Sequence, residues 1–142
     1  MIVLHDKYEI DDAILRVDFP AVTAWLAASY WSPGILQARV EQGARNSTLV
    51  IGTYRDGKQV AFARVVSDTT RFAYLSDVIV DAAQQGKGIA RAMVQFALTH
   101  PALAGVEKWF LRTEDAHGVY APLGFAPITD SHFWMARHPK KG

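Results

Sequence analysis

The sequence predicts one domain of mixed α/β structure in which helices and strands do not alternate strictly. Three observations predict it: a capped helix pattern early in the chain, two β-rich runs joined by a turn, and an apolar run that leads through glycines into a helix. A length of 142 residues is enough for one core of its own and too little for two. We therefore expect a single domain over residues 1–142.

Composition and charge exclude several classes of function and of partner. The 15 Lys and Arg against 14 Asp and Glu give a net charge of +1, without the basic excess that binding a nucleic-acid backbone requires. No signal-peptide pattern opens the chain, and no apolar run approaches the roughly 18 residues of a membrane span. The absence of cysteine excludes a disulfide scaffold and a cysteine nucleophile, and the five histidines lack metal-ligand spacing. We expect a cytoplasmic protein with no metal and no nucleic-acid or membrane partner.

Two helices are expected before the first strong strand. Asp18 followed by Phe19-Pro20 is typical of a helix start, because a carboxylate caps the first turn and proline fits there, so we predict a helix over residues 18–30. Ser32-Pro33 indicates a second start and Gly43 its end.

Three strands are expected next. Residues 48–54 and 59–66 flank Asp56-Gly57, which is a hairpin signal. Residues 72–80 are so apolar on both faces that we predict a central strand covered on each side. Together these strands should form a meander.

The remaining chain is predicted to return to the sheet. Residues 89–99 carry Arg91, Gln95 and Thr99 at every fourth position, which predicts a mostly buried helix with one exposed stripe. Further strands are expected over residues 108–112, 125–129 and 132–136, with a short helix over 115–121.

The junction between the predicted apolar strand and the predicted buried helix favours the binding of an anion. A helix start leaves backbone N–H groups without partners, and Gly86 and Gly88 would let a phosphate approach them closely. Two familiar phosphate motifs do not fit. A P-loop would need glycine where Asp81 stands, and the third glycine of a dinucleotide fingerprint falls on Arg91.

The pattern Gln85-x-x-Gly88-x-Ala90 matches the Q/R-x-x-G-x-G/A signature of the GNAT superfamily of N-acetyltransferases. About thirty residues on, Tyr120 with Gly124-Phe125 resembles a second element of this family. The resemblance covers residues 72–125 and, by element order, the whole chain; more narrowly, residues 29–31, 74–77 and 115–118 resemble a branch of small bacterial members. It implies a GNAT-type acyl-CoA N-acyltransferase fold, with a mixed, mostly antiparallel sheet of six to seven strands flanked by about four helices.

The resemblance implies acetyl-CoA as the donor and an amine as the acceptor, with direct transfer because no cysteine could carry an acyl group. Thr113 stands where many members have an asparagine that contacts the pantetheine arm, and its hydroxyl can still donate. The implied donor-binding residues are, for the pantetheine arm, Val78, Ile79 and Val80, and for the pyrophosphate, Gln85, Gly86, Lys87, Gly88, Ile89, Ala90 and Arg91. Main chain near Val78 would polarise the thioester carbonyl.

The resemblance places Tyr120 as the general acid that protonates the departing thiolate. Without the Gly124-Phe125 context an aromatic packing the last helix would be preferred, and with it we favour the acid. Two residues compete as the base. Asp77 lies in an apolar strand and is either a proton acceptor or a buried, hydrogen-bonded carboxylate. His117 lies one helical turn before Tyr120 and is either a base or a surface residue.

The acceptor itself cannot be identified from this chain. Tyr30, Trp31 and Trp134 lie in regions that bind the acceptor in this family, and they are equally consistent with core or dimer contacts. Dimers are frequent in the family, so a homodimer is allowed. The alternative function is a non-catalytic module on the same fold that senses acetyl-CoA or CoA or presents a partner surface.

Overall fold

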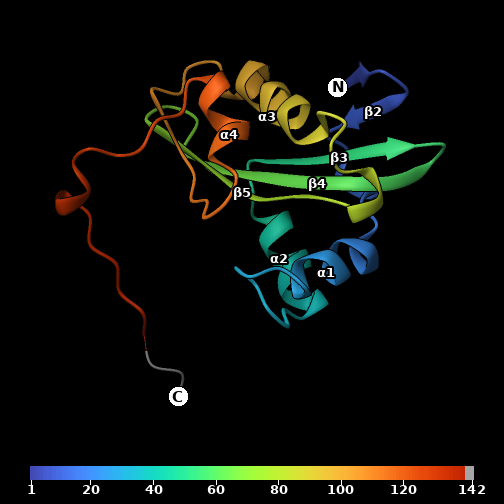
Figure 1. Ribbon diagram of the computed structural model, residues 1–142, viewed down its shortest axis with the longest axis horizontal. Coiled ribbons are helices and arrows are strands. Elements are labelled where there is room, and N and C mark those ends of the chain that lie inside the picture. The colour runs from blue at the N-terminus through green and yellow to red at the C-terminus, as the bar shows by residue number, and fades with distance from the viewer. Residues whose placement is uncertain (140–142) are drawn as a thin grey trace.

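A computed structural model of the chain describes residues 1–139 (Figure 1). These residues form four α-helices and one six-stranded sheet. The helices are α1 (Phe19–Ala27), α2 (Gln37–Arg45), α3 (Ile89–Thr99) and α4 (His117–Tyr120). The strands are β1 (Ile2–His5), β2 (Tyr8–Asp11), β3 (Leu49–Arg55), β4 (Lys58–Ser67), β5 (Phe72–Val80) and β6 (Lys108–Phe110). None of the helices within residues 1–139 has the length and apolarity that crossing a bilayer requires.

The sheet has the order β1-β2-β3-β4-β5-β6 and is antiparallel except for the parallel pair of β5 and β6. The prediction of a mixed, mostly antiparallel sheet of six to seven strands is therefore confirmed. β5 pairs with β6 only over Phe72–Tyr74, opposite Lys108–Phe110. Beyond Tyr74 the two strands separate, and this separation creates the space described below.

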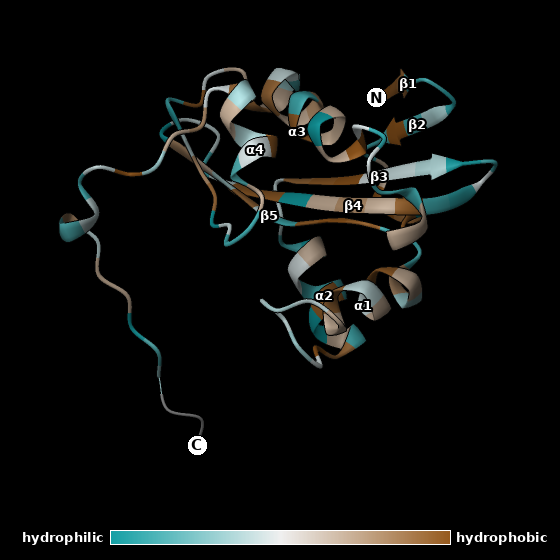
Figure 2. Cartoon of the chain, viewed as in Figure 1, coloured by the Kyte–Doolittle hydropathy of each residue, from teal (hydrophilic) through white to brown (hydrophobic). Residues whose placement is uncertain are grey.

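The sheet lies between two layers of helices, with α3 and α4 on one face and α1 and α2 on the other (Figure 1). Strand alternation explains why both faces are apolar, since neighbouring residues point to opposite faces. In β4, Ala61 and Ala63 pack in the cluster that contains α3, whereas Phe62 packs in the cluster that contains α1 and α2. Figure 2 shows the corresponding hydrophobic colouring of the strands between the helices.

Several predicted elements are confirmed. Asp18 caps α1 by accepting a hydrogen bond from the backbone N–H of Ala21 at 3.1 Å. The meander of β3, β4 and β5 forms as expected, and α3 has the predicted bounds. Its exposed residues include the predicted stripe of Arg91, Gln95 and Thr99.

The bounds of the first two helices differ from the prediction. α1 ends at Ala27 instead of Tyr30, and α2 begins at Gln37 instead of Ser32. The later start of α2 follows from Gly34, whose positive φ of 69° cannot continue a helix, so Ser32-Pro33 opens a turn instead. α2 then continues through Gly43, which was predicted to end it, to Arg45.

The hairpin of β1 and β2 was not predicted from the sequence. Helices lie on both faces of β5 as predicted, with Ile79 packed toward α1 and α2 and Val80 toward α3, but Ser76 to Val80 are only half-buried. β6 ends at Phe110 rather than residue 112, and α4 begins at His117 rather than residue 115.

The predicted strands over residues 125–129 and 132–136 are not formed. The regular structure there is a 3₁₀ turn over Ser131–Phe133, and within residues 1–139 neither segment pairs with the sheet, because β propensity alone does not supply backbone pairing.

Alanine substitution at two glycines should change the stability of the protein in opposite directions. A Cβ at Gly43 in α2 would make ordinary contact with Arg64, 3.8 Å from Cζ, so Gly43→Ala should stabilise the protein by about 0.5–1 kcal/mol. A Cβ at Gly52 in β3 would lie 2.6 Å from Cζ of the buried Tyr54 ring, so Gly52→Ala should cost roughly 1–3 kcal/mol. Urea unfolding of both variants measures this, and equal stability of the two would contradict the packing described here.

Candidate functional site

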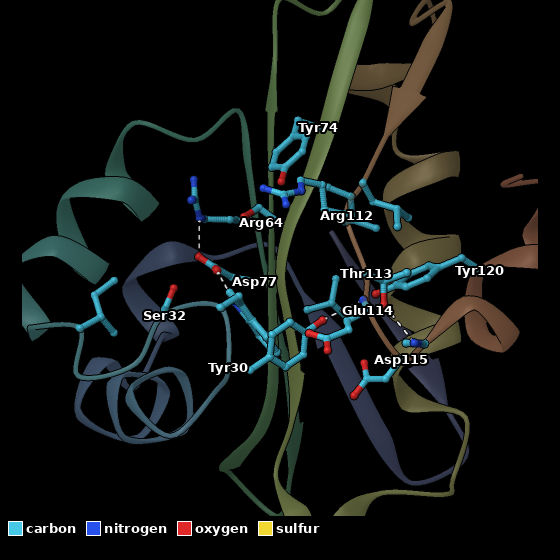
Figure 3. A pocket seen from close by; sticks show the side chains of 17 residues that line it. Tyr30, Ser32, Arg64, Tyr74, Asp77, Arg112, Thr113, Glu114, Asp115 and Tyr120 are labelled. Carbon is cyan, nitrogen blue, oxygen red and sulfur yellow. Dashed lines mark hydrogen bonds and ion pairs between the residues drawn. The ribbon is translucent and has the colours of Figure 1, made fainter. Parts of the chain in front are cut away.

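A cleft of about 930 Å³ lies where β5 and β6 separate (Figure 3). Its walls come from three parts of the chain: the loop after α1, the end of the sheet, and the segment from β6 to α4. The loop contributes Tyr30, Trp31, Ser32 and Ile35; the sheet contributes Arg64 and residues 74–78; the third wall consists of residues 111–116 and Tyr120. The separation of two strands thus leaves a cleft at the sheet end that is lined by polar and apolar residues alike.

Tyr120 is the most buried of the predicted catalytic residues, with 9% of its surface exposed. It lies at the end of α4, and its ring packs edge-on against Phe125 with 6.0 Å between centroids. Burial, followed by the neighbouring Tyr30 and Asp115, raises the pKa of Tyr120 to about 12. The phenol therefore keeps its proton at neutral pH and can act as a donor.

Asp77 lies at an irregularity in β5. Its φ is 55°, a left-handed conformation that Asp tolerates better than most residues, and the β4–β5 register shifts between Phe62 and Arg64 opposite it. Its carboxylate accepts a hydrogen bond from Arg64 Nε at 2.8 Å and another from Trp31 Nε1 at 3.1 Å. Both oxygens are thus engaged, and the loop after α1 is tied to the central strands (Figure 3).

The loop before α3 has the geometry of an anion site. Gly86 and Gly88 have φ values of 81° and 75°, which only glycine adopts readily. In the part of the chain that the structure describes, no side chain caps the helix that starts at Ile89. The first N–H groups of α3 are therefore free of intrahelical partners. A Cβ at Gly86 would meet nothing within 4 Å, so the loop is open to a ligand.

The unpredicted N-terminal hairpin holds this loop in place. His5 Nε2 lies 2.9 Å from the carbonyl oxygen of Lys87, and the Tyr8 hydroxyl donates to the side-chain oxygen of Gln84. These contacts join residues about 80 positions apart, so no local pattern could have indicated them.

The other predicted site residues differ in their placement. Val78 and Thr113 line the cleft, and the Thr113 hydroxyl accepts from the backbone of Ala116 at 3.0 Å. Ile79 packs toward α1 and α2, and Val80 packs toward α3. Ala116 occupies the N-cap of α4, and Asp115 lines the cleft.

Two predicted residues lie outside the cleft. His117 is exposed at the start of α4 and does not line it. The ring of Trp134 packs on Phe110 with 5.0 Å between centroids, whereas Tyr30 and Trp31 form part of the cleft wall. Within residues 1–139, His, Asp and Glu side chains form no group of three suited to a metal ion.

Sequence reasoning missed several cleft residues. Arg64 was detectable, because it is a charged residue in an apolar strand and Asp77 is its opposite charge in the neighbouring strand of the meander. Glu114 had no such signal; its backbone N–H donates to the Tyr30 hydroxyl at 3.0 Å. Tyr74, Ser76 and Arg112 complete the missed set.

Comparison with known proteins agrees with the family resemblance of the sequence motifs. The model of the acetyltransferase (GNAT) family matches residues 9–125. A Xanthomonas campestris pv. campestris protein assigned to the GNAT acetyltransferase family is 35% identical, with a TM-score of 0.88 over 96% of this chain and 95% of that one. Among curated proteins there is no match to this chain.

Two more distant structures share the fold. An acetyltransferase of Clostridium acetobutylicum, solved with acetyl-CoA, is 16% identical with a TM-score of 0.66 over 97% of this chain and 96% of that one. Glucosamine-6-phosphate N-acetyltransferase of Arabidopsis thaliana is also 16% identical, with a TM-score of 0.65 over 94% of this chain and 99% of that one.

Proposed function

Because the chain belongs to the GNAT family of acetyltransferases, we propose that it transfers an acetyl group from acetyl-CoA directly to an amine. The observation that carries the proposal is the buried, protonated phenol of Tyr120 in a cleft between separated strands. Direct transfer is consistent with the absence of cysteine. We place the reaction in the cytoplasm and treat residues 1–142 as one catalytic domain.

The residues present fit the donor. Beyond Tyr74 the edge of β5 has no strand partner within residues 1–139, and it offers backbone N–H and C=O groups to an extended pantetheine arm, with Val78 in the cleft wall. The free N–H groups at the start of α3 and the glycine loop from Gln85 to Gly88 suit a pyrophosphate. Lys87 and Arg91 are exposed beside them and add positive charge.

When bound, acetyl-CoA supplies the acetyl group as a reactive thioester. The N–H groups of β5 near Val78 are suited to donate to the thioester oxygen as negative charge develops there. Tyr120 then gives its proton to the sulfur as the C–S bond breaks, and the new amide bond forms to the acceptor nitrogen. Burial keeps this proton on Tyr120 until that step.

The acceptor amine must lose a proton to become a nucleophile, and we propose that Asp77 receives it, directly or through a water molecule. Asp77 lines the cleft and His117 does not. Arg64 Nε, 2.8 Å from the Asp77 carboxylate, fixes the position of this side chain in the cleft wall. Trp31 and Tyr30 would form the aromatic wall beside a cationic amine.

Tyr120→Phe removes the proposed acid without changing the packing of the ring. We expect turnover, measured as acetyl-CoA-dependent release of free thiol with an amine that the wild type acetylates, to fall by roughly 10²–10⁴-fold. Acetyl-CoA affinity should stay within about two-fold. Tyr74→Phe makes the same chemical change on another wall of the cleft and should retain activity within a few-fold.

The pH profile gives an independent check on Tyr120. Because its pKa is raised to about 12, the acid stays protonated through pH 10, where an ordinary tyrosine is half ionised. Wild-type kcat/KM should therefore show no fall near pH 10. Unchanged turnover in Tyr120→Phe would remove this residue from the mechanism, and acetyl-CoA binding without turnover on any amine would favour the non-catalytic module.

Asp77→Asn tests the proposed base, since Asn tolerates the same left-handed backbone and keeps the side-chain size. We expect kcat/KM to fall by about 10²-fold or more. His117→Ala is the matched control and should stay within about two-fold of wild type. Loss of activity in His117→Ala with retention in Asp77→Asn would reverse the assignment.

A further inference from the structure

The walls of the cleft carry three charged side chains that the proposed mechanism does not use. Arg112, Glu114 and Asp115 all line the cleft, and all lie on its third wall, between β6 and α4. None of them takes part in an ion pair within residues 1–139. The other two charges of the cleft, Arg64 and Asp77, offset each other across 2.8 Å. An acceptor in the cleft therefore meets one cation and two carboxylates that are not already neutralised by the described chain.

These charges are separated along the cleft. Figure 3 shows Arg112 in the upper part of the view and Glu114 and Asp115 in the lower part, beside Tyr30. The Tyr30 hydroxyl accepts a hydrogen bond from the backbone N–H of Glu114 at 3.0 Å, which joins the lower part of this wall to the loop after α1. We call Glu114 and Asp115 the acidic end of the cleft and Arg112 its basic end.

The phenol of Tyr120 lies near the acidic end. After burial and the neighbouring Tyr30, Asp115 is the third cause that raises the pKa of Tyr120, so its carboxylate is close enough to act on that hydroxyl. The proposed reaction takes place beside this hydroxyl, because Tyr120 gives its proton to the sulfur. An acceptor amine is a cation near pH 7 until it loses its proton. The acidic end therefore attracts the amine to the place where it must react.

The basic end is within reach of the same small molecule. Arg112 and Asp115 are three residues apart, so their Cα atoms are at most about 11 Å from each other. An arginine presents its N–H groups as a fork that matches the two oxygens of a carboxylate. A simple amine would bring only positive charge toward Arg112, and a phosphorylated amine would bring a double negative charge toward the acidic end. A carboxylate supplies the single negative charge that Arg112 lacks.

We propose that the acceptor is an amino acid, a small molecule that carries a carboxylate as well as the amine that is acetylated. The carboxylate binds Arg112, and the amine lies at the acidic end. This inference rests on the proposed function, because it names the acceptor of the same cleft. The reaction is unchanged: the N–C bond forms, the C–S bond breaks, Asp77 takes one amine proton, the sulfur takes the proton of Tyr120, and the carboxylate does not react.

Pairs of acceptors that differ only by the carboxylate test the proposal. The pairs are L-alanine and ethylamine, 4-aminobutyrate and propylamine, L-lysine and cadaverine, and L-tyrosine and tyramine. Release of free thiol from acetyl-CoA gives kcat/KM for each compound. A site built around a charged group of its substrate discriminates against the analogue that lacks it. We expect the amino acid to exceed its amine by about 10-fold or more in at least one pair.

Arg112→Gln should abolish this preference, because the amide keeps a polar side chain of similar reach without the positive charge. We expect the ratio of kcat/KM between amino acid and amine to fall to about one. Arg71→Gln is the matched control: Arg71 is exposed and does not line the cleft, so this variant should keep the wild-type ratio. Equal use of both members of every pair, or a preference that persists in Arg112→Gln, would overturn the proposal. Faster acetylation of O-phosphoethanolamine than of any amino acid would overturn it in favour of a phosphate.

A binding measurement separates this inference from the proposed function. Isothermal titration of the four amino acids into the protein is carried out in the presence of CoA, which has no acetyl group to transfer. We expect binding of the preferred amino acid to weaken by about 10-fold or more in Arg112→Gln and to be unchanged in Arg71→Gln. Such binding without turnover of any amine would refute the transferase and support the amino-acid site. Turnover that ignores the carboxylate would do the reverse, and neither turnover nor binding would refute both.

Discussion

The early separation of β5 from β6 is the constraint on which the site depends. The two strands share only three residue pairs, from Phe72 to Tyr74, and a longer ladder would close the cleft. At Asp77 the chain leaves regular strand geometry, and the ion pair with Arg64 holds that irregular backbone against β4. Because the hydrogen bond from Trp31 ends on the same carboxylate, the position of the loop after α1 is linked to the strand that would bind the donor.

The two ends of β5 serve different purposes. At its start, pairing with β6 anchors the segment that leads through residues 111–116 to α4 and brings Tyr120 to the cleft. At its end, the chain enters the glycine loop and then α3, whose buried side packs on the sheet. The N-terminal hairpin fixes that loop from the other direction through His5 and Tyr8. The glycine loop and the cleft are thus both positioned by β5, together with its pairing to β6 and the N-terminal hairpin.

Local chemistry explains which features the sequence could predict. The Asp18 cap, the Asp56-Gly57 turn and the glycine loop are each encoded within a few residues, and all appear in the structure. The hairpin of β1 and β2 was missed because its strands are short and gain a partner only through β3, more than 40 residues later. The ion pair of Asp77 could not be predicted, because it depends on the β4–β5 register. The predicted C-terminal strands did not form, because β propensity alone supplies no partner strand.

The central claim is that this fold binds acetyl-CoA, and a thermal-shift titration with acetyl-CoA, CoA and ATP tests it most directly. Ligand at about 100 times its Kd adds about 2.7 kcal/mol to the stability of the folded state. For a domain of this size we predict a saturable rise of roughly 5–10 °C with acetyl-CoA and with CoA, and none with ATP. No shift with millimolar acetyl-CoA would contradict the account, because the loop from Gln85 to Ala90 would then be only the start of a helix.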